Sequence, residues 1–235
     1  MSKLPYACLI AAALACSTVG AAPSPRPAVI ELYTSQGCSS CPPADALLGE
    51  LTRKSNVLAL AFHVDYWNNL GWTDPYSLRD AVIRQSAYSK ARGQASVYTP
   101  QVVVDGRDEY LGSDRGKIER AVGEVRTGVP VTLDVVDQNL VIALGGAQCL
   151  APSDVLAVTF LRKAVSKIGR GENSGRTLEE FNIVRSIRKI GKWSGEAATL
   201  HVPLSTIPRD ATDFAVLVQL PGQAQIIGAA TRALP

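Results

Sequence analysis

Short apolar runs of strand length alternate with helical periodicity over the first half of the chain. Residues 29–34 and 57–64 are mostly apolar, and between them Ala44, Leu47 and Leu51 recur at helical spacing. This pattern predicts a strand–helix–strand unit. The prediction continues with a helix over about 76–92, a strand at 101–105, a turn at 106–108, a strand near 108–111 and a helix over about 113–126.

Beyond Gly128-Val-Pro130 the helical periods give way to short β-rich segments. These segments are separated by turn-forming sequences such as Asp137-Gln-Asn139 and Pro221-Gly222. A compact β-sandwich is the expected result. The segments are 131–136, 140–144, 155–161, 199–202, 214–220 and 225–230.

Two cysteines, Cys38 and Cys41, follow the first apolar strand and precede the first helix. A helix start favours a thiolate through its backbone N–H groups and its dipole. The loop is too short for its disulfide to remove much unfolded-chain entropy, so redox chemistry explains the pair better than stabilisation. In such pairs the first cysteine is normally the exposed attacker, so we assign Cys38 as nucleophile and Cys41 as resolving thiol. Pro42 and Pro43 predict a helix that begins near Pro42, which leaves the dipole effect on Cys38 open.

Thr99 and Pro100 stand immediately before the strand expected at 101–105. In thioredoxin-like folds such a proline is cis and lies against the dithiol, where the backbone of the residue before it pairs with a peptide substrate. The alternative is an ordinary trans bond at a strand start. The order of elements is also that of a thioredoxin core. We therefore predict an α/β thioredoxin-like domain over 28–127, followed by a mostly β, sandwich-like domain over 128–235.

Four stretches of the chain resemble a known family. They are ELYTSQGCSSCPPAD, AFHVDYWNNLGW, VYTPQVVVDG and GENSGRTLEEFNIVR. They are similar to the secreted thioredoxin-like family known as domain of unknown function 1223, and the likeness covers nearly the whole mature chain. The resemblance implies an exported thioredoxin-like protein of unsettled activity, with the same order of roles for Cys38 and Cys41.

Three polar residues are candidates for tuning the cysteines. His63 and Asp65 share one strand face by the two-residue period, and parallel strands end at the edge that carries Cys38. Glu31, seven residues before Cys38, is a candidate buried proton acceptor. Two of them have a structural alternative: His63 as a satisfied structural residue and Glu31 at a partly solvated edge.

The loop from Tyr66 to Tyr76 is rich in aromatic residues in a chain with only 6% of them. Next to a dithiol, Trp67 and Trp72 could form an apolar platform for substrate side chains. The alternative is a satellite core under a long loop.

The first residues have the layout of a secretory signal. Lys3 is followed by an apolar stretch and small residues, and the pattern predicts a signal peptide over 1–21, with a Pro-rich spacer over 22–27. A lipoprotein signal ending at Cys16 is the alternative. We expect a periplasmic or secreted protein with no transmembrane segment in the mature chain. Of the remaining cysteines, Cys149 is either a buried small residue or a free thiol.

Composition limits the classes of partner. Lys and Arg total 24 against 21 Asp and Glu, so no global charge points to nucleic acid. Two His and one Met are few soft ligands, which disfavours a metal site, and we expect no cofactor. Residues 162–192 carry nine basic and three acidic side chains, which indicates either a solvated face or a docking surface for an acidic partner.

These observations predict an exported thiol-disulfide oxidoreductase. Its partners would be protein or small thiols and disulfides, together with a redox partner protein. The alternative is a redox-inactive envelope binding or assembly module with the same fold. A metal-binding chaperone using Cys38, Cys41 and His63 ranks third.

Overall fold

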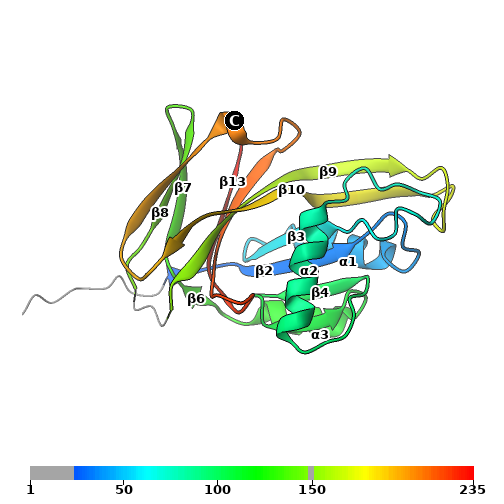
Figure 1. Cartoon of the computed structure of the whole chain (residues 1–235), viewed down its shortest axis with the longest axis horizontal. Helices are drawn as coiled ribbons and strands as arrows, with labels where there is room; N and C mark the ends of the chain where they lie inside the picture. The colour runs from blue at the N-terminus through cyan, green and yellow to red at the C-terminus, as the bar shows by residue number, and fades with distance from the viewer. Residues whose placement is uncertain (1–23, 148–150) are drawn as a thin grey trace, which may run out of the picture.

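The computed structural model describes residues 24–147 and 151–235, and strands dominate it (Figure 1). Strands make up 44% of it and helices 17%. The predicted signal peptide, Cys16 and Cys149 lie outside the described residues. The elements up to residue 128 are β1 (Ser24–Pro25), β2 (Ala28–Thr34), α1 (Pro42–Leu51), β3 (Val57–His63), α2 (Arg79–Ala91), β4 (Gln101–Val104), β5 (Asp108–Leu111), α3 (Arg115–Gly123) and β6 (Thr127–Gly128).

The regular elements in the rest of the described chain are strands and one 3-10 turn. Its two longest elements, β9 and β10, form one antiparallel ribbon that runs along the length of the molecule (Figure 1). The elements are β7 (Val131–Val136), β8 (Asn139–Leu144), β9 (Ser153–Lys167), β10 (Thr177–Trp193), β11 (Ala198–Pro203), a 3-10 turn (Leu204–Thr206), β12 (Asp213–Gln219) and β13 (Ile226–Ala233).

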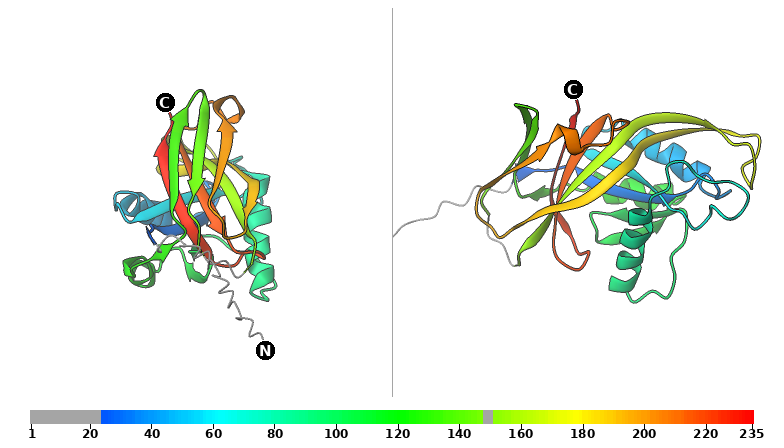
Figure 2. Two further views of the ribbon diagram at one scale, coloured as in Figure 1. Left: turned by 90° about the vertical axis from the view of Figure 1, so that its left-hand side faces the viewer. Right: turned by 45° about the horizontal axis from the view of Figure 1, so that its top comes forward.

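One eight-stranded sheet takes strands from both halves of the chain. Its order is β13-β12-β9-β10-β3-β2-β4-β5. Strands β2 and β3 are parallel, and β10 joins β3 in parallel with Ile183 opposite Ala61; the other neighbours are antiparallel. A three-stranded sheet, β11-β8-β7, lies at the end of the molecule away from the hairpin that connects β9 to β10 (Figure 2).

The predicted fold class, a thioredoxin-like α/β domain followed by a sandwich-like domain, is wrong. The protein is mostly β with large mixed sheets, and a separate thioredoxin-like α/β domain is not shown. The physical reason is β10, a strand that was not predicted because its segment is rich in basic residues and was interpreted as a surface. Its pairing with β3 extends the sheet of the first half into β9, β12 and β13. The division at residues 127 and 128 into independently folding domains stays a prediction.

Three apolar cores hold the layers together. Helix α2 covers one face of the large sheet through Ala81 and Tyr88, while α1 and α3 cover the other. The third core lies between the three-stranded sheet and the end of the large sheet formed by β9 and β12. Among the described helices, none has the length and apolarity needed to cross a membrane.

Candidate functional site

The two cysteines of the C-x-x-C motif form a disulfide at the start of α1. Their Cα atoms are 5.4 Å apart. Strand β2 ends at Thr34, a turn follows in which Cys38 N–H donates to the Ser35 carbonyl, and Cys41 occupies the N-cap of α1. Both cysteines are fully buried, whereas the two serines between them are exposed. The pair is therefore reached only through its own loop or by movement of what covers it.

The start of α1 offers Cys38 little electrostatic help. The helix begins at Pro42, as the sequence predicted, so its first two residues lack N–H groups. The next two N–H groups, of Ala44 and Asp45, both donate to the Cys41 carbonyl. A different donor stands beside the sulfur, because Ser40 Oγ lies 3.3 Å from Cys38 Sγ. The Ser40 hydroxyl is placed to donate a hydrogen bond to a Cys38 thiolate.

Gln36, two residues before Cys38, is the centre of a buried polar cluster. Its side-chain amide donates to both carboxylate oxygens of Glu180, at 3.0 and 2.8 Å, and its N–H donates to Asp74 at 2.9 Å. Its side-chain oxygen accepts from the Trp72 indole at 2.8 Å. Both polar atoms of the Gln36 side chain are thus engaged, and the loop that leads to Cys38 is held by the loop at residues 72–74 and by β10.

His63 lies in the same cluster, at the end of β3. Its Nδ1 is 2.7 Å from Asp74 Oδ2, and its Nε2 is 3.8 Å from Glu180 Oε1. Burial opposes a charge on the imidazole, but Asp74, Glu180 and Asp45 outweigh it and raise the pKa of His63 to about 9. Burial also acts against ionised Asp74, yet His63 and the N–H donors hold the pKa of Asp74 below its usual range. At neutral pH the two form a buried ion pair.

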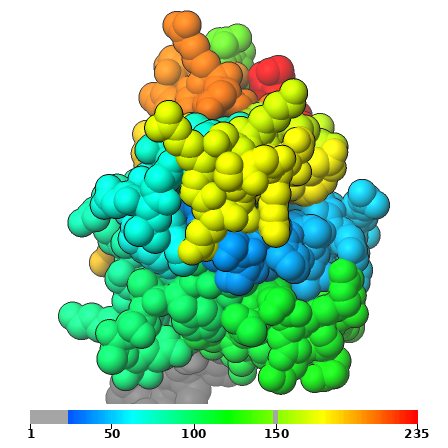
Figure 3. All heavy atoms as spheres, turned by 90° about the vertical axis from the view of Figure 1, so that its right-hand side faces the viewer, coloured from blue at the N-terminus to red at the C-terminus, as the bar shows by residue number. Residues whose placement is uncertain are grey.

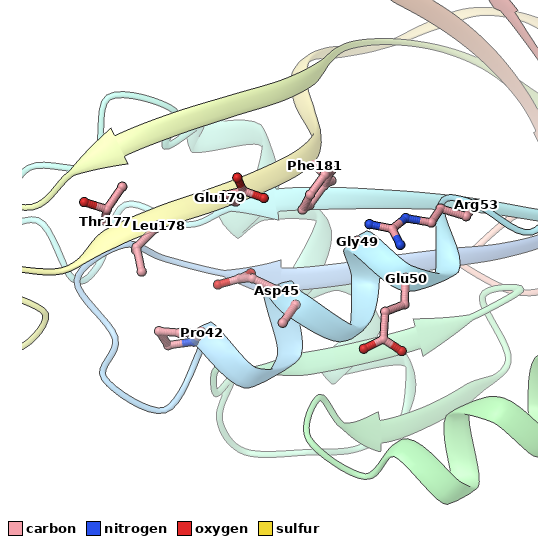
Figure 4. Close-up of a pocket in the computed structure, with 10 residues that line it drawn as sticks. Pro42, Asp45, Gly49, Glu50, Arg53, Thr177, Leu178, Glu179 and Phe181 are labelled. Carbon is pink, nitrogen blue, oxygen red and sulfur yellow. The ribbon is translucent and has the colours of Figure 1, made fainter.

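Asp45, in the first turn of α1, is a second residue whose pKa is strongly shifted. It is half-buried and accepts a 2.8 Å hydrogen bond from the Thr34 hydroxyl. Burial raises its pKa to about 7. Asp45 also lines a pocket of about 320 Å³ between α1 and β10, together with Phe181 and Glu179 (Figure 4). The carboxyl group lies one turn below Cys41 and can change protonation in the physiological range.

The peptide bond between Thr99 and Pro100 is cis, as the sequence predicted. Trp67 connects this motif to residues 35–41, the loop that carries both cysteines and is called the dithiol loop below. Its indole N–H donates to Thr99 Oγ1 at 2.9 Å, and its Cβ lies 3.0 Å from the position that a Cβ on Gly37 would take. A side chain at residue 37 would therefore crowd Trp67. The two motifs, about sixty residues apart in the chain, share one neighbour.

Pro100 also approaches the start of α1. A Cβ placed on Gly112 would lie 2.7 Å from Pro100 Cβ and 2.9 Å from Ala44 Cβ, so only one glycine separates the proline from the helix. The structure thus brings Cys38, Cys41, Thr99, Pro100, Trp67, Trp72 and His63 into one region.

Two predicted tuning residues lie in other surroundings. Glu31 is fully buried and paired with Arg84 at 2.6 Å, and it also accepts from Tyr88, so both of its oxygens are occupied. Asp65 is half-buried in the turn after β3, and within the described residues no hydrogen bond joins its side chain to His63. The acid that partners His63 is Asp74.

The comparisons with known proteins assign the chain to a family. The model of the protein family of unknown function DUF1223 matches residues 29–219, a segment that contains both cysteines, Pro100 and the Gln36 cluster. The chain belongs to the DUF1223 family. No curated protein matches the DUF1223 chain at a significant level.

Two solved structures are similar to this DUF1223 protein. Protein AGR_C_4864 from Agrobacterium tumefaciens shares 32% identity with a TM-score of 0.77, over 89% of this chain and 95% of that chain. HBP35 of Porphyromonas gingivalis shares 15% identity with a TM-score of 0.60, over 89% of this chain and 76% of that chain. At that identity the second likeness concerns the fold alone.

Several site residues of this DUF1223 protein escaped the sequence reasoning. Asp74, Glu180 and Gln36 surround His63 from segments up to 144 residues apart, which no local pattern reveals. Asn173 is buried and bonds the dithiol loop. One signal was present: Gln36 and Asn173 both stand in stretches that carry the family resemblance. Within the described residues, no group of three or more His, Cys, Asp or Glu is arranged to hold a metal ion.

Proposed function

We propose that this DUF1223 protein is an exported thiol-disulfide oxidoreductase that acts through Cys38 and Cys41 on protein or small thiols. The observation that carries the proposal is the disulfide itself. It closes a loop of three residues, too short to stabilise the fold appreciably by restricting the unfolded chain. Because this disulfide stabilises the fold so little, redox chemistry explains it better than stability does.

The proposed reaction is an exchange between this disulfide and a dithiol substrate. A substrate thiolate attacks Cys38 Sγ, forming a mixed disulfide, and the electron pair of the broken bond leaves on Cys41 Sγ. The second substrate thiolate then attacks the substrate sulfur of the mixed disulfide and releases Cys38 as a thiolate. Two electrons pass to the protein, the substrate leaves as a disulfide, and two protons pass from substrate thiols to the cysteines or solvent. Microscopic reversal gives the reductase direction.

The surroundings of the pair supply groups suited to this exchange. The Ser40 hydroxyl beside Cys38 can donate to a thiolate. Asp45, one turn from Cys41 with a pKa of about 7, can take up or release a proton near neutral pH. Thr99, Pro100, Trp67 and Trp72 stay proposed substrate contacts.

The predicted signal peptide supports a location in the periplasm or outside the cell, where disulfides persist. The proposed partners are protein thiols or disulfides and a redox partner protein. Nucleic acid is not among them.

A second function, that of a redox-inactive binding or assembly module, is favoured by one observation. Both cysteines are fully buried, so no thiol reaches them in this conformation. In this alternative the disulfide is a static feature of the loop.

A redox titration against glutathione, with thiols counted by alkylation, separates the two functions. The mature protein should show a reversible two-electron couple confined to Cys38 and Cys41, and Cys149→Ser should leave it unchanged. With Cys41→Ser, Cys38 should accumulate mixed disulfides, whereas Cys38→Ser should trap few. A pair that neither oxidises nor reduces in the folded protein would leave the module as the function. Equal trapping by both variants would reverse the assignment of attacker and resolver.

A further inference from the structure

The tip of the β9–β10 ribbon, residues 168–176, reaches from the second half of the chain onto the dithiol loop (Figure 3). The tip is folded by its own backbone: Gly175 N–H donates to the Ile168 carbonyl, and Ile168 N–H donates to the Arg176 carbonyl. Gly171 packs against Trp72, since a Cβ there would lie 3.1 Å from Trp72 Cβ. The tip is therefore a preformed element that rests on the site.

Asn173 makes the closest connection between the tip and the cysteines. Its Nδ2 donates to the carbonyls of Gln36 and Cys38, each at 2.9 Å, and the side chain is fully buried. Its Oδ1 has no hydrogen-bond partner within the described residues. Next to it, the exposed Glu172 accepts from Ser39 N–H at 3.1 Å. The tip is thus hydrogen-bonded to the backbone of Gln36, Cys38 and Ser39.

These hydrogen bonds affect how a thiol gains access to the disulfide. A thiolate attacks a disulfide sulfur directly, so access to the sulfur limits the rate. Cys38 and Cys41 are fully buried, and the exposed groups beside them are Ser39 and Ser40. A large thiol therefore needs the loop and the tip to separate, whereas a small thiol needs a smaller opening.

We propose that Asn173 is a positioning residue that decides which thiols reach Cys38, by fastening the β9–β10 tip to the dithiol loop. The inference rests on the proposed exchange activity. It assigns to the second half of the chain a part in the specificity of the site. Small thiols are admitted through a small opening of the loop, and bulky protein thiols are admitted only when the tip is displaced.

Two monothiols of similar chemistry and different size test this assignment. The oxidised protein is treated with mercaptoethanol or with a long polyethylene glycol carrying a terminal thiol, and loss of the Cys38–Cys41 disulfide is followed by alkylation and mass. Breaking two neutral hydrogen bonds in Asn173→Ala should raise the rate with the polymer thiol about tenfold, with a much smaller change for mercaptoethanol. Ser174→Ala, which alters an exposed neighbour on the same tip, should match the wild type.

The ratio of the two rates separates positioning from general loosening. Equal ratios in wild type and Asn173→Ala, or a proportional rise with both thiols, would overturn the assignment. If Asn173→Ala does not fold, Glu172→Ala at the exposed position should raise the polymer rate by a smaller factor, and an unchanged ratio there would overturn it as well. If neither thiol reduces the folded wild-type protein, the proposed exchange activity itself fails, and the assignment fails with it.

Discussion

One buried polar cluster is built on Glu31 of strand β2 and another on Gln36 in the turn after this strand, and they differ in how completely their hydrogen bonds are satisfied. In the Glu31 cluster, both carboxylate oxygens bond Arg84, at 2.6 and 3.1 Å, and Arg84 also bonds Tyr88 and Gln219. In the Gln36 cluster, His63 Nε2 and Asn173 Oδ1 have no hydrogen-bond partner among the described residues. We call the Glu31 cluster saturated, because the groups named in it all have partners. We call the Gln36 cluster unsaturated, because two of its polar atoms have no partner among the described residues.

The difference separates a structural role from a chemical one. Glu31 on β2 is bonded to Arg84 and Tyr88 on α2, so it fits a structural role that joins this helix to the sheet. The Gln36 cluster includes His63 and lies near Asp45, whose pKa values are about 9 and 7, and its free acceptor and ring nitrogen leave room for a change of protonation. Perturbed pKa values of this kind concentrate at functional sites.

The largest expected effect comes from breaking the saturated cluster. Arg84→Met leaves Glu31 buried without its counter-charge, so the free energy of unfolding should fall by about 3–5 kcal/mol, measured by urea denaturation. The alkylation rate of Cys38 in the reduced, folded fraction should stay near the wild-type value. Arg79→Met, at an exposed position of the same helix, is the control and should change stability little. A strong change in the Cys38 rate would show that the two clusters act as one.

A smaller effect is expected from titrating the unsaturated cluster. The folded protein holds the pKa of His63 at about 9, above the unfolded value near 6.5, so the folded state binds the extra proton. This stabilisation is complete below about pH 6.5 and is lost as pH rises through about 9. The unfolding free energy should therefore decline across this range, by on the order of 2–3 kcal/mol.

The protein contains two histidines, which gives this pH test a matched control. His63→Gln should abolish most of the slope between pH 7 and 9, whereas His201→Gln, at an exposed position, should retain it. A slope that survives in His63→Gln would assign the titration to other groups and remove His63 from the comparison.

The sequence predicted local elements better than the sheet that joins them. Short strands such as β2, β3 and β5 fall within one or two residues of their expected positions. Strand β10 was missed because its outward positions carry basic side chains, so the segment resembled a solvated face rather than a strand. The fold class was wrong for this reason, since β10 is the strand that joins the two halves.

The site shows the same limit. The C-x-x-C pair and the Thr-Pro motif are local signals and were found. His63 was found as a candidate, and Asp65 was named with it because the two-residue period places both on one strand face. Asp74, the acid that bonds His63, lies in the loop after the strand, where that period no longer applies. Glu180 and Asn173 reach the site through the pairing of β10 with β3, and no spacing along the chain encodes that pairing.

The smallest expected effect concerns the single hydrogen bond between Trp67 and Thr99, which links the Thr-Pro motif to the dithiol loop. Trp67→Phe and Thr99→Val each remove one partner, and a double-mutant cycle isolates the bond from the other consequences of each change. We expect a coupling of about 0.5–1.5 kcal/mol in the unfolding free energy. We also expect non-additive changes in the rate at which reduced Cys38 is alkylated, because Trp67 is the neighbour that Gly37 and Thr99 share. Coupling in stability without coupling in the alkylation rate would make this bond structural, like those around Glu31, and would restrict the chemical cluster to the groups around Gln36.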